Sequence, residues 1–441
     1  MKRYLIIAAL TATTLSLRAG TAWTVSQCMR YAIDHAHSVA TQRYALDDSR
    51  AERTRAVGNF LPSVEASIGA QYNFGRAIDP ETNTYTDVST FYNSYSLSAS
   101  LTVFDGLQHY NQLRMARANV LAGRSALQAE QDKVALNVYK AYMDLMYCHG
   151  AIGMATAKRD ESRALLHQTE VMAEVGQKSD ADVAQMQATL AADDYEVTHM
   201  QSQTAKALLT LKQLMHYPAD DSLSIDCTLT GADTDAACDQ VAAGEEASCL
   251  NPRVIQATQA VTAARHSLRA ARGALLPTLS IGAGVSTMFY RNLDGTAYTH
   301  FADQMRNNAG EYVYATLSIP IFNRLSTVAS IRKSRNALRQ AEETLAYERS
   351  ELRRLAAEAE TDVRNSTQET IKMERKVEAD SIAAHIAVRK YEEGMASPID
   401  VKTATVTLLQ SRASLLQSRL TLMYNRKLLQ YYKGNSLWTD Q

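Results

Sequence analysis

The feature that most constrains the fold is the run of residues 324–390, which contains neither proline nor glycine. Its apolar residues recur seven positions apart with charged and polar residues between them, and this predicts one long amphipathic helix. At about 1.5 Å per residue, roughly 66 residues form a helix on the order of 100 Å long, longer than an ordinary globular domain. The residues of this repeat are Ile331, Leu338, Leu345, Leu352 and Ala359.

The same pattern occurs about 218 positions earlier in the chain, at Leu113, Val120, Leu127, Val134 and Ala141. The flanking segments are related by the same shift to within a few residues, so the chain is predicted to be an internal duplication. Residues 23–217 form the first predicted repeat and 249–433 the second, with long helices at about 106–173 and 324–391. Residues 218–248 link the repeats, and 434–441 form a C-terminal tail.

Composition and the N-terminus narrow the class of protein. The formal net charge of the 441-residue chain is −1, so no strongly basic composition indicates a nucleic-acid partner. Residues 1–22 resemble a secretory signal peptide, with Lys2 and Arg3, an apolar run, and small residues before a cleavage point. An N-terminal membrane anchor is the alternative, but the apolar run is shorter than the roughly 20 residues that a spanning helix needs. We therefore expect an exported protein.

Between the predicted helices, apolar residues occur at every second position instead of at helical spacing. This alternation predicts strands at about 62–75 and 92–104, and again at about 277–291 and 312–322. One face of each strand is apolar and the other small or hydroxylic. The first strand of each pair follows Ala-x-Gly-x-x-Leu-Pro, in which glycine and proline end the preceding helix. In the first repeat that helix is predicted to begin at Ser26, as its cap.

A soluble sheet with one wet face would show the same alternation. A membrane sheet fits better, because the strands are long, no other segment reads as a second sheet, and the chain is exported. Tyrosines near the strand ends indicate an interfacial girdle. Four strands are too few to close a barrel, so other copies of the chain must complete it. The tyrosines are Tyr72, Tyr92, Tyr95, Tyr290, Tyr312 and Tyr314.

Both long helices are bounded by matching signals. Asp105 and Asn323 follow the second strand of each repeat and are predicted to cap the helix that begins there. At the far end, both copies contain Gly-x-x-x-x-x-Asp-Val, at residues 176–183 and 394–401. The glycine is predicted to end the long helix and the aspartate to start a shorter returning helix.

With these paired junctions and turns, essentially the whole mature chain resembles the TolC-like outer membrane efflux protein family. The resemblance implies an α+β membrane protein and a homotrimer, in which four strands per chain form a twelve-stranded β-barrel continued by a periplasmic α-helical barrel. It implies a passive water-filled exit duct in the Gram-negative outer membrane, without a cofactor. The implied partners are a periplasmic adaptor protein and an inner-membrane efflux transporter or secretion ATPase.

The resemblance also implies that residues in and after the second turn close the periplasmic mouth. Tyr391 and Asp400 match the family's tyrosine and its first aspartate. Ala396 and Thr403 stand where the family has an arginine and a second aspartate, which puts the usual gating network in doubt. Three Asp400 carboxylates would repel anions at close range. A helix cap at Asp400 and simple packing of Tyr391 remain open as alternatives.

The turns themselves are the implied docking tips, where the family meets the helical hairpin of its adaptor. Ordinary helix termination explains the two glycines equally well from local sequence. The residues of the predicted tips are Gly176, Asp182, Val183, Gly394 and Val401.

No catalytic or metal-binding constellation is apparent: the chain has no His-Glu-x-x-His motif and no glycine-rich phosphate loop, so neither an enzyme nor a metal site is predicted. Transport would then depend on a partner or a gradient. The main alternative is a non-conducting periplasmic coiled-coil rod, structural or adhesive, anchored by the β-hairpins, although a rod has no need of two-faced strands. Two of Cys227, Cys238 and Cys249 could pair in an oxidising compartment.

Overall fold

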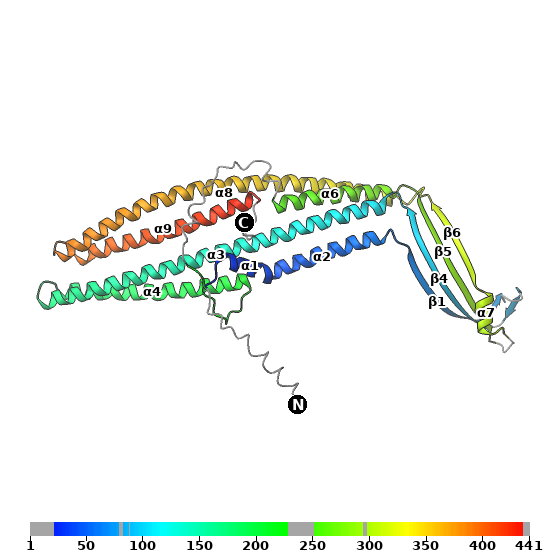
Figure 1. Ribbon diagram of the computed structural model, residues 1–441, viewed down its shortest axis with the longest axis horizontal. Coiled ribbons are helices and arrows are strands. Elements are labelled where there is room, and N and C mark those ends of the chain that lie inside the picture. The colour runs from blue at the N-terminus through cyan, green and yellow to red at the C-terminus, as the bar shows by residue number, and fades with distance from the viewer. Residues whose placement is uncertain (1–21, 79–82, 88, 228–250, 294–297, 435–441) are drawn as a thin grey trace, which may run out of the picture. The chain divides into compact units, whose positions relative to one another are not determined.

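The computed structural model describes residues 22–78, 83–87, 89–227, 251–293 and 298–434 (Figure 1). These residues form two compact units. The helical unit lies within 1–43, 126–255 and 348–441, and the sheet unit comprises 44–125 and 256–347. The predicted signal peptide, except its last residue, and most of the 218–248 linker lie outside the described residues, as does the C-terminal tail after Gly434.

The internal duplication is confirmed by the helices. Helices α3 (Gln108–Glu174) and α8 (Ser326–Glu392) each contain 67 residues, and both their first and their last residues are 218 positions apart. The returning helices α4 (Asp180–Met215) and α9 (Pro398–Tyr432) begin with the same offset. The part of each long helix that lies in the helical unit forms a hairpin with its returning helix.

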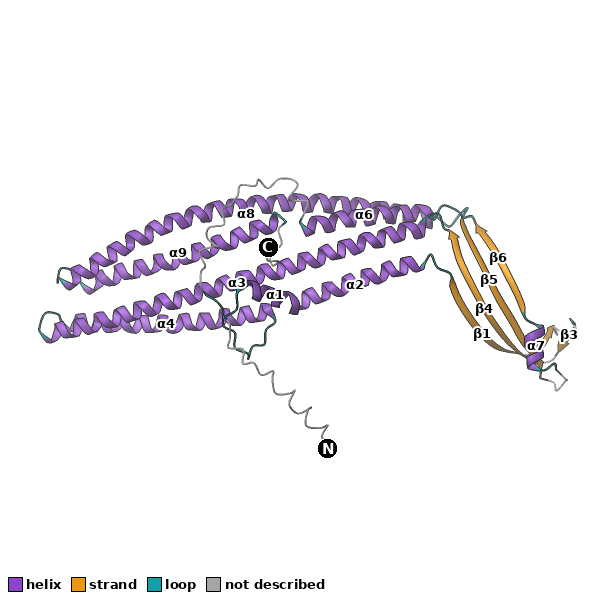
Figure 2. Ribbon diagram, viewed as in Figure 1, coloured by secondary structure: helices purple, strands orange, loops and turns teal. Residues whose placement is uncertain are grey.

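The sheet unit contains one four-stranded antiparallel sheet, drawn in orange in Figure 2. Its strands are β1 (Ser63–Asn73), β4 (Thr90–Phe104), β5 (Thr278–Asn292) and β6 (Gly310–Ser318), in the order β1-β4-β5-β6. The inner strands therefore come from different repeats, and β1 and β6 are the two edges.

The strand register gives the sheet two distinct faces. Val64, Ala99, Ala283 and Val313 are partners in one row across all four strands. The adjacent row, from Ser63 through Ser100 and Gly282 to Tyr314, belongs to the opposite face, because side chains alternate along a strand. Val64 is 67% exposed and Val313 84%. An apolar face that stands open in the single chain confirms the predicted alternation and suits a lipid environment.

The predicted tyrosine girdle is only partly correct. Tyr72 and Tyr95 belong to the apolar face, but the register places the other four tyrosines on the polar face. Tyr312 and Tyr314 lie against Gly284 and Gly282, where a β-carbon would meet the ring atoms at about 2.6 Å. Their rings thus cover glycines of the neighbouring strand, which is a packing role that composition near strand ends does not reveal.

Three details of the sheet differ from the prediction. Strand β6 ends at Ser318 instead of continuing to 322, because Pro320 has no N–H for a ladder hydrogen bond. Between β1 and β4, where no strand was predicted, there is a small second sheet of β2 (Arg76–Ile78) with β3 (Tyr85–Asp87). The loop before β6 contains helix α7 (Phe301–Asn307), which Gln304 fastens to β5 by hydrogen bonds with the Tyr290 N–H and carbonyl, both 2.9 Å.

The junction between helices and sheet is closely packed at the inner elements. Asp105 caps α3 as predicted, since its carboxylate accepts hydrogen bonds from the N–H groups of Gln108 (3.0 Å) and His109 (2.6 Å). Gly106 follows with a φ of 69°. Its backbone lies against that of Gly273, the last residue of α6 (Pro252–Gly273), so neither position has room for a β-carbon.

The helical unit has one main apolar core, where α1 (Val25–His35) packs with the middle of α3 and the ends of α4 and α9. The prediction of a single first helix capped by Ser26 is wrong. Thr24 is the cap, with its hydroxyl accepting from the Gln27 N–H, and extended backbone at Ala36 separates α1 from α2 (His37–Gly58). No glycine or proline marks this break, so the sequence gives no signal for it.

Cys28 lies in this core and is fully buried, and burial raises the pKa of its thiol to about 12. Cys148 and Cys227 form no disulfide with another described residue. The predicted disulfide among Cys227, Cys238 and Cys249 involves two residues outside the described part of the chain.

Candidate gate and docking tips

Each hairpin of the helical unit turns on a left-handed glycine. Gly176 has a φ of 77° and Gly394 a φ of 74°, a region that other residues adopt only with strain. The Gly176 N–H donates to the Ala173 carbonyl and the next N–H to that of Met172, and the second repeat makes the same two bonds. This Schellman arrangement satisfies the last carbonyls of each long helix. The glycines therefore end the helices as the sequence predicts.

The prediction that Asp182 and Asp400 start the returning helices is wrong, because each helix begins earlier, with a capping box. Ser179 and Ser397 are the caps, and Asp182 and Asp400 stand three positions later. The Asp400 carboxylate accepts from the Ser397 N–H (2.9 Å) and hydroxyl (2.8 Å), while the Asp400 N–H donates to that hydroxyl. The repeated Ser-x-x-Asp spacing is the signal that identifies these caps.

Both aspartates are ionised more readily than an isolated carboxyl group. Hydrogen bonds from the backbone and hydroxyl of Ser397 lower the pKa of Asp400, and those of Ser179 lower the pKa of Asp182. Asp400 is exposed, so its negative charge is available to solvent at the tip. The carboxylate thus combines a local capping role with an accessible charge.

Tyr391 links the two hairpins. Its side chain is fully buried and its hydroxyl lies 2.8 Å from the Thr169 hydroxyl of α3. Because Thr169 already donates to the Leu165 carbonyl (2.7 Å), the tyrosine is the donor between them. The ammonium of Lys178, in the first tip, lies 4.3 Å from the centre of the Tyr391 ring. Sequence reasoning missed Thr169 and Lys178, since they lie in the other repeat.

The other predicted gate position is ordinary in its local geometry. Thr403 is exposed and its hydroxyl donates to the Ile399 carbonyl (2.8 Å) one turn earlier. Ala396, where the family's arginine would be, is half-buried. Neither residue carries a charge, so neither supplies the ionic contact that the family resemblance implies at its position.

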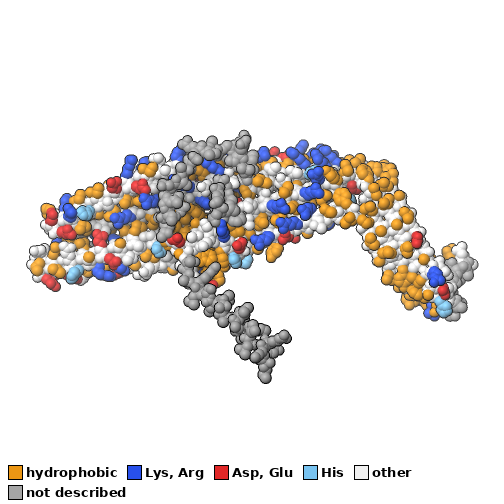
Figure 3. Space-filling model, viewed as in Figure 1, with side chains coloured by type: hydrophobic (Ala, Val, Ile, Leu, Met, Phe, Trp, Pro, Cys, Tyr) orange, Lys and Arg blue, Asp and Glu red, His pale blue; other side chains and the backbone are white. Residues whose placement is uncertain are grey.

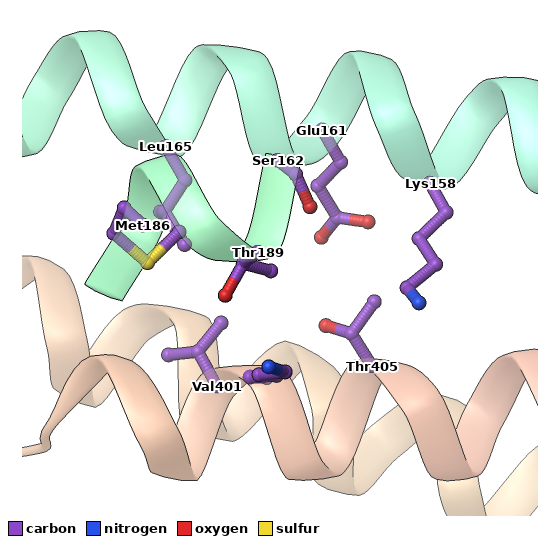
Figure 4. A pocket seen from close by; sticks show the side chains of 9 residues that line it. Lys158, Glu161, Ser162, Leu165, Met186, Thr189, Val401 and Thr405 are labelled. Carbon is purple, nitrogen blue, oxygen red and sulfur yellow. The ribbon is translucent and has the colours of Figure 1, made fainter. Parts of the chain in front are cut away.

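The two tip valines differ in exposure. Val183 is half-buried, whereas Val401 is 2% exposed and lines a pocket between α9 and the first hairpin (Figure 4). The Val401 side chain therefore packs the hairpins together. The remaining lining residues are Lys158, Glu161, Ser162, Leu165, Met186, Thr189, Lys402 and Thr405.

Beside this pocket, a buried polar group ties each hairpin together. In the first repeat, buried Asp193 of α4 accepts from Ser162 (2.6 Å) and from Lys158 (2.8 Å) of α3. In the second repeat the serine and aspartate exchange helices: Ser411 of α9 donates to Asp380 of α8. These positions are equivalent, since they are 218 apart, so the two repeats preserve the bond while exchanging its ends.

This exchange predicts a compensating pair of substitutions. Asp193→Ser alone leaves Lys158 and Ser162 without their acceptor and should lower the free energy of unfolding by about 2 kcal/mol. Adding Ser162→Asp recreates the arrangement of the second repeat and should restore most of that loss. Thermal unfolding of the two variants measures the recovery. Failure of the double variant to recover would show that the two sites are not interchangeable.

The described residues contain no group of three or more His, Cys, Asp or Glu side chains arranged to hold a metal ion. Among the same residues, no helix is long and apolar enough to cross a membrane. At the two tips, the hydrogen-bonded polar side chains are the capping pairs Ser179 with Asp182 and Ser397 with Asp400.

Comparison with known proteins decides the family. The family model described as outer membrane efflux protein matches residues 29–215 and 243–432. The chain belongs to the outer membrane efflux protein family. It is an efflux channel of the Gram-negative outer membrane that extends into the periplasm, and it is not an enzyme. Family membership thus favours the exit duct over the non-conducting rod.

Individual relatives agree with this assignment. The pyoverdine export outer membrane protein OpmQ of Pseudomonas putida is 24% identical over 88% of this chain and 81% of its own length. The solved structure of CusC, studied for transmembrane channel formation, has a TM-score of 0.81 at 16% identity, covering 95% of this chain and 96% of CusC. VceC of Vibrio cholerae has a TM-score of 0.78 at 14% identity, covering 94% and 96%. Outer membrane efflux proteins assemble as homotrimers within tripartite efflux systems.

Proposed function

We propose that three copies of this chain close a twelve-stranded barrel and form a passive exit duct. The observation that carries this proposal is the sheet with two open edges, β1 of 11 residues and β6 of nine. Open edges do not persist in hydrocarbon, where each backbone N–H and C=O needs a partner. Four strands are half of the smallest membrane barrels, which have about eight. Pairing of β1 with β6 of the next copy satisfies both edges.

The experiment that tests this proposal is native mass spectrometry of the protein purified in detergent. We expect a mass equal to that of three chains, and we expect this mass to remain when the protein is diluted. A monomer with the same secondary structure would contradict the closed barrel, because its sheet edges would then be tolerated in detergent without partners.

The tips are the proposed contact with the periplasmic adaptor, and an inner-membrane transporter or secretion ATPase would supply the work. Support comes from exposed apolar side chains at both turns: Val175 is 66% exposed, Met395 67% and Ile399 60%. Exposed apolar residues grouped at a helix turn are typical of a protein–protein contact. Gly176, Gly394, Asp182 and Val183 shape these turns, and buried Val401 holds them together from within.

We also propose that Asp400 carboxylates form a cation-selective ring at the periplasmic mouth, with Tyr391 as the contact that holds the mouth shut. The lowered pKa of Asp400 supports the ring, because the charge then persists below the ordinary value of 3.8. The ionised Asp400 carboxylate contributes to folding stability at any pH above the pKa of Asp400 in the unfolded chain. This contribution is lost as the pH falls through the lower pKa of Asp400 in the folded protein.

A matched pair of variants separates the ring from the cap. Asp400→Ala should reduce the cation selectivity of single channels, measured as a shift in reversal potential across a salt gradient. Asp182→Ala removes an equivalent capping box in the first repeat and should leave the reversal potential near that of the wild type. Equal shifts in the two variants would mean that Asp400 acts only as part of a helix cap.

A further inference from the structure

Three of the four helical segments that adjoin the sheet contain basic residues and no acidic residue; the fourth, in α2, also contains Asp47, Asp48 and Glu52. Residues 106–125 contain three arginines, 256–277 three arginines, and 319–341 four arginines and a lysine, and none of these stretches contains aspartate or glutamate. Figure 3 shows Lys and Arg side chains gathered over α3, α6 and α8 near the sheet, beside a sheet surface rich in hydrophobic side chains. The near-neutral net charge of the chain conceals this local excess.

One order of exposed residues recurs on α2, α3 and α8 and across the end of α6, where Leu276 lies in the turn after the last helical residue, Gly273. An apolar side chain, between 40% and 46% exposed, lies nearer to the strand. An exposed arginine lies four residues from it in sequence, on the side farther from the strand. Four positions are about one helical turn. The pairs are Val57 with Arg53, Tyr110 with Arg114, Leu276 with Arg272, and Val328 with Arg332.

Contacts between α3, α6 and α8 bring the arginines of these three helices together, whereas Arg53 of α2 has acidic neighbours in its own helix. His266 of α6 bonds to Asn111 of α3 (3.2 Å). Burial first, and then the charges of Arg269 and Arg114, lower the pKa of His266, so both guanidinium groups lie near this one imidazole. Arg265 on the exposed stripe of α6 pairs with Glu342 of α8 (3.3 Å). The stripes of α3, α6 and α8 therefore adjoin one another.

The arginines of α3 and α6 are also remote from the edges at which copies of the chain would meet. These helices continue from β4 and β5, the two inner strands of the sheet. Arg117, Arg269 and Arg272 are exposed and have no ion-pair partner among the described residues. A neighbouring copy is thus poorly placed to neutralise them, and they are accessible to an anionic ligand from solution or from the membrane.

We propose that a basic belt, formed by Arg114, Arg117, Arg269, Arg272, Arg332 and Arg335, binds the phosphate groups of anionic phospholipids in the periplasmic leaflet. Tyr110, Leu276 and Val328 would lie at the hydrocarbon boundary, and Arg114, Arg272 and Arg332, about one turn or 5.4 Å away, would extend into the headgroup layer. Arg117, Arg269 and Arg335 lie three residues farther along each helix, from where their long side chains would extend back toward the same layer. That layer is roughly 5 to 8 Å thick on each side of the bilayer core. Guanidinium groups bind phosphate through paired hydrogen bonds.

The proposal depends on the outer-membrane location of the family and not on the proposed gate or adaptor contact. Its test is binding of phosphatidylglycerol, added as detergent-mixed lipid to the purified full-length protein and followed by native mass spectrometry. We expect the triple variant Arg117→Gln, Arg269→Gln, Arg272→Gln to bind this lipid roughly a hundredfold more weakly than the wild type. The triple variant and the wild type should bind neutral phosphatidylcholine equally, and they should also bind inorganic phosphate equally.

The matched control neutralises three exposed arginines of α8 in the helical unit, as Arg364→Gln, Arg375→Gln and Arg389→Gln, and should bind phosphatidylglycerol like the wild type. Equal lipid binding by the belt variant and the wild type would overturn the proposal. Loss of the oligomer by the belt variant in lipid-free detergent would also overturn it, by assigning the arginines to contacts between copies. If the belt variant lost as much affinity for inorganic phosphate as for phosphatidylglycerol, the belt arginines would be a site for free anions and not for lipid.

Discussion

Gly273→Ala should unfold the junction between helices and sheet, whereas the same change at the equivalent glycine of the first repeat should be harmless. A β-carbon at residue 273 would overlap the carbonyl oxygen of Gly106 and approach Cγ of Gln108 to 2.8 Å. The obstacle is mainly backbone, held by a positive φ at Gly106, so side-chain movement cannot relieve it. We expect a loss of about 3 kcal/mol or more in the free energy of unfolding.

Gly58→Ala is the matched control. It lies in the same Ala-x-Gly-x-x-Leu-Pro motif, at the end of α2, with nothing within 4 Å of its added β-carbon. Alanine there should stabilise the helix by roughly 0.5–1 kcal/mol. Thermal unfolding of the detergent-solubilised protein, read by circular dichroism and by survival of the oligomer on gels, distinguishes the two. Similar melting temperatures for both variants would contradict the close approach at Gly273.

Tyr391→Ala should both destabilise the helical unit and open the periplasmic mouth. Removing a fully buried aromatic side chain leaves a cavity and costs about 3–5 kcal/mol. It also deletes the hydrogen bond to Thr169 and the contact with Lys178, which connect the end of α8 to the first hairpin. With that connection lost, we expect a higher mean single-channel conductance than in the wild type.

Tyr391→Phe separates packing from hydrogen bonding. The ring remains for Lys178, and Thr169 keeps its bond to the Leu165 carbonyl, so the loss in unfolding free energy should be about 1 kcal/mol. If the hydroxyl holds the mouth shut, this variant should conduct more than the wild type while remaining nearly as stable. If Tyr391→Ala destabilises the protein without changing conductance, Tyr391 is a packing residue and not part of a gate.

The sequence was sufficient for features that depend on local periodicity. The seven-residue spacing predicted α3 and α8 and their 218-residue offset, and the alternation of small and apolar residues predicted the two faces of the sheet. The ends of the long helices were predicted equally well. Gly176 and Gly394 adopt the left-handed conformation that glycine favours at the end of a helix.

Features that depend on neighbouring elements could not be read in the same way. The motifs at Gly58 and Gly273 are alike, yet only the second lies against another backbone, because α6 is an inner helix of the sheet unit. Tyr312 and Tyr314 were assigned to an interface from their place near strand ends, while register puts them over glycines on the polar face. For the gate, the sequence indicated Tyr391 but gave no sign of its partner Thr169, 222 residues away.

Whether the chain forms a water-filled duct is tested by single-channel conductance of the purified oligomer in a planar lipid bilayer, measured for the wild type and for Tyr391→Ala. An exit duct predicts discrete current steps, brief or small in the wild type if its mouth rests shut, and larger in the variant. Inserted oligomers of both proteins that carry no current would contradict a water-filled channel and would restore the non-conducting rod as the better account of this chain.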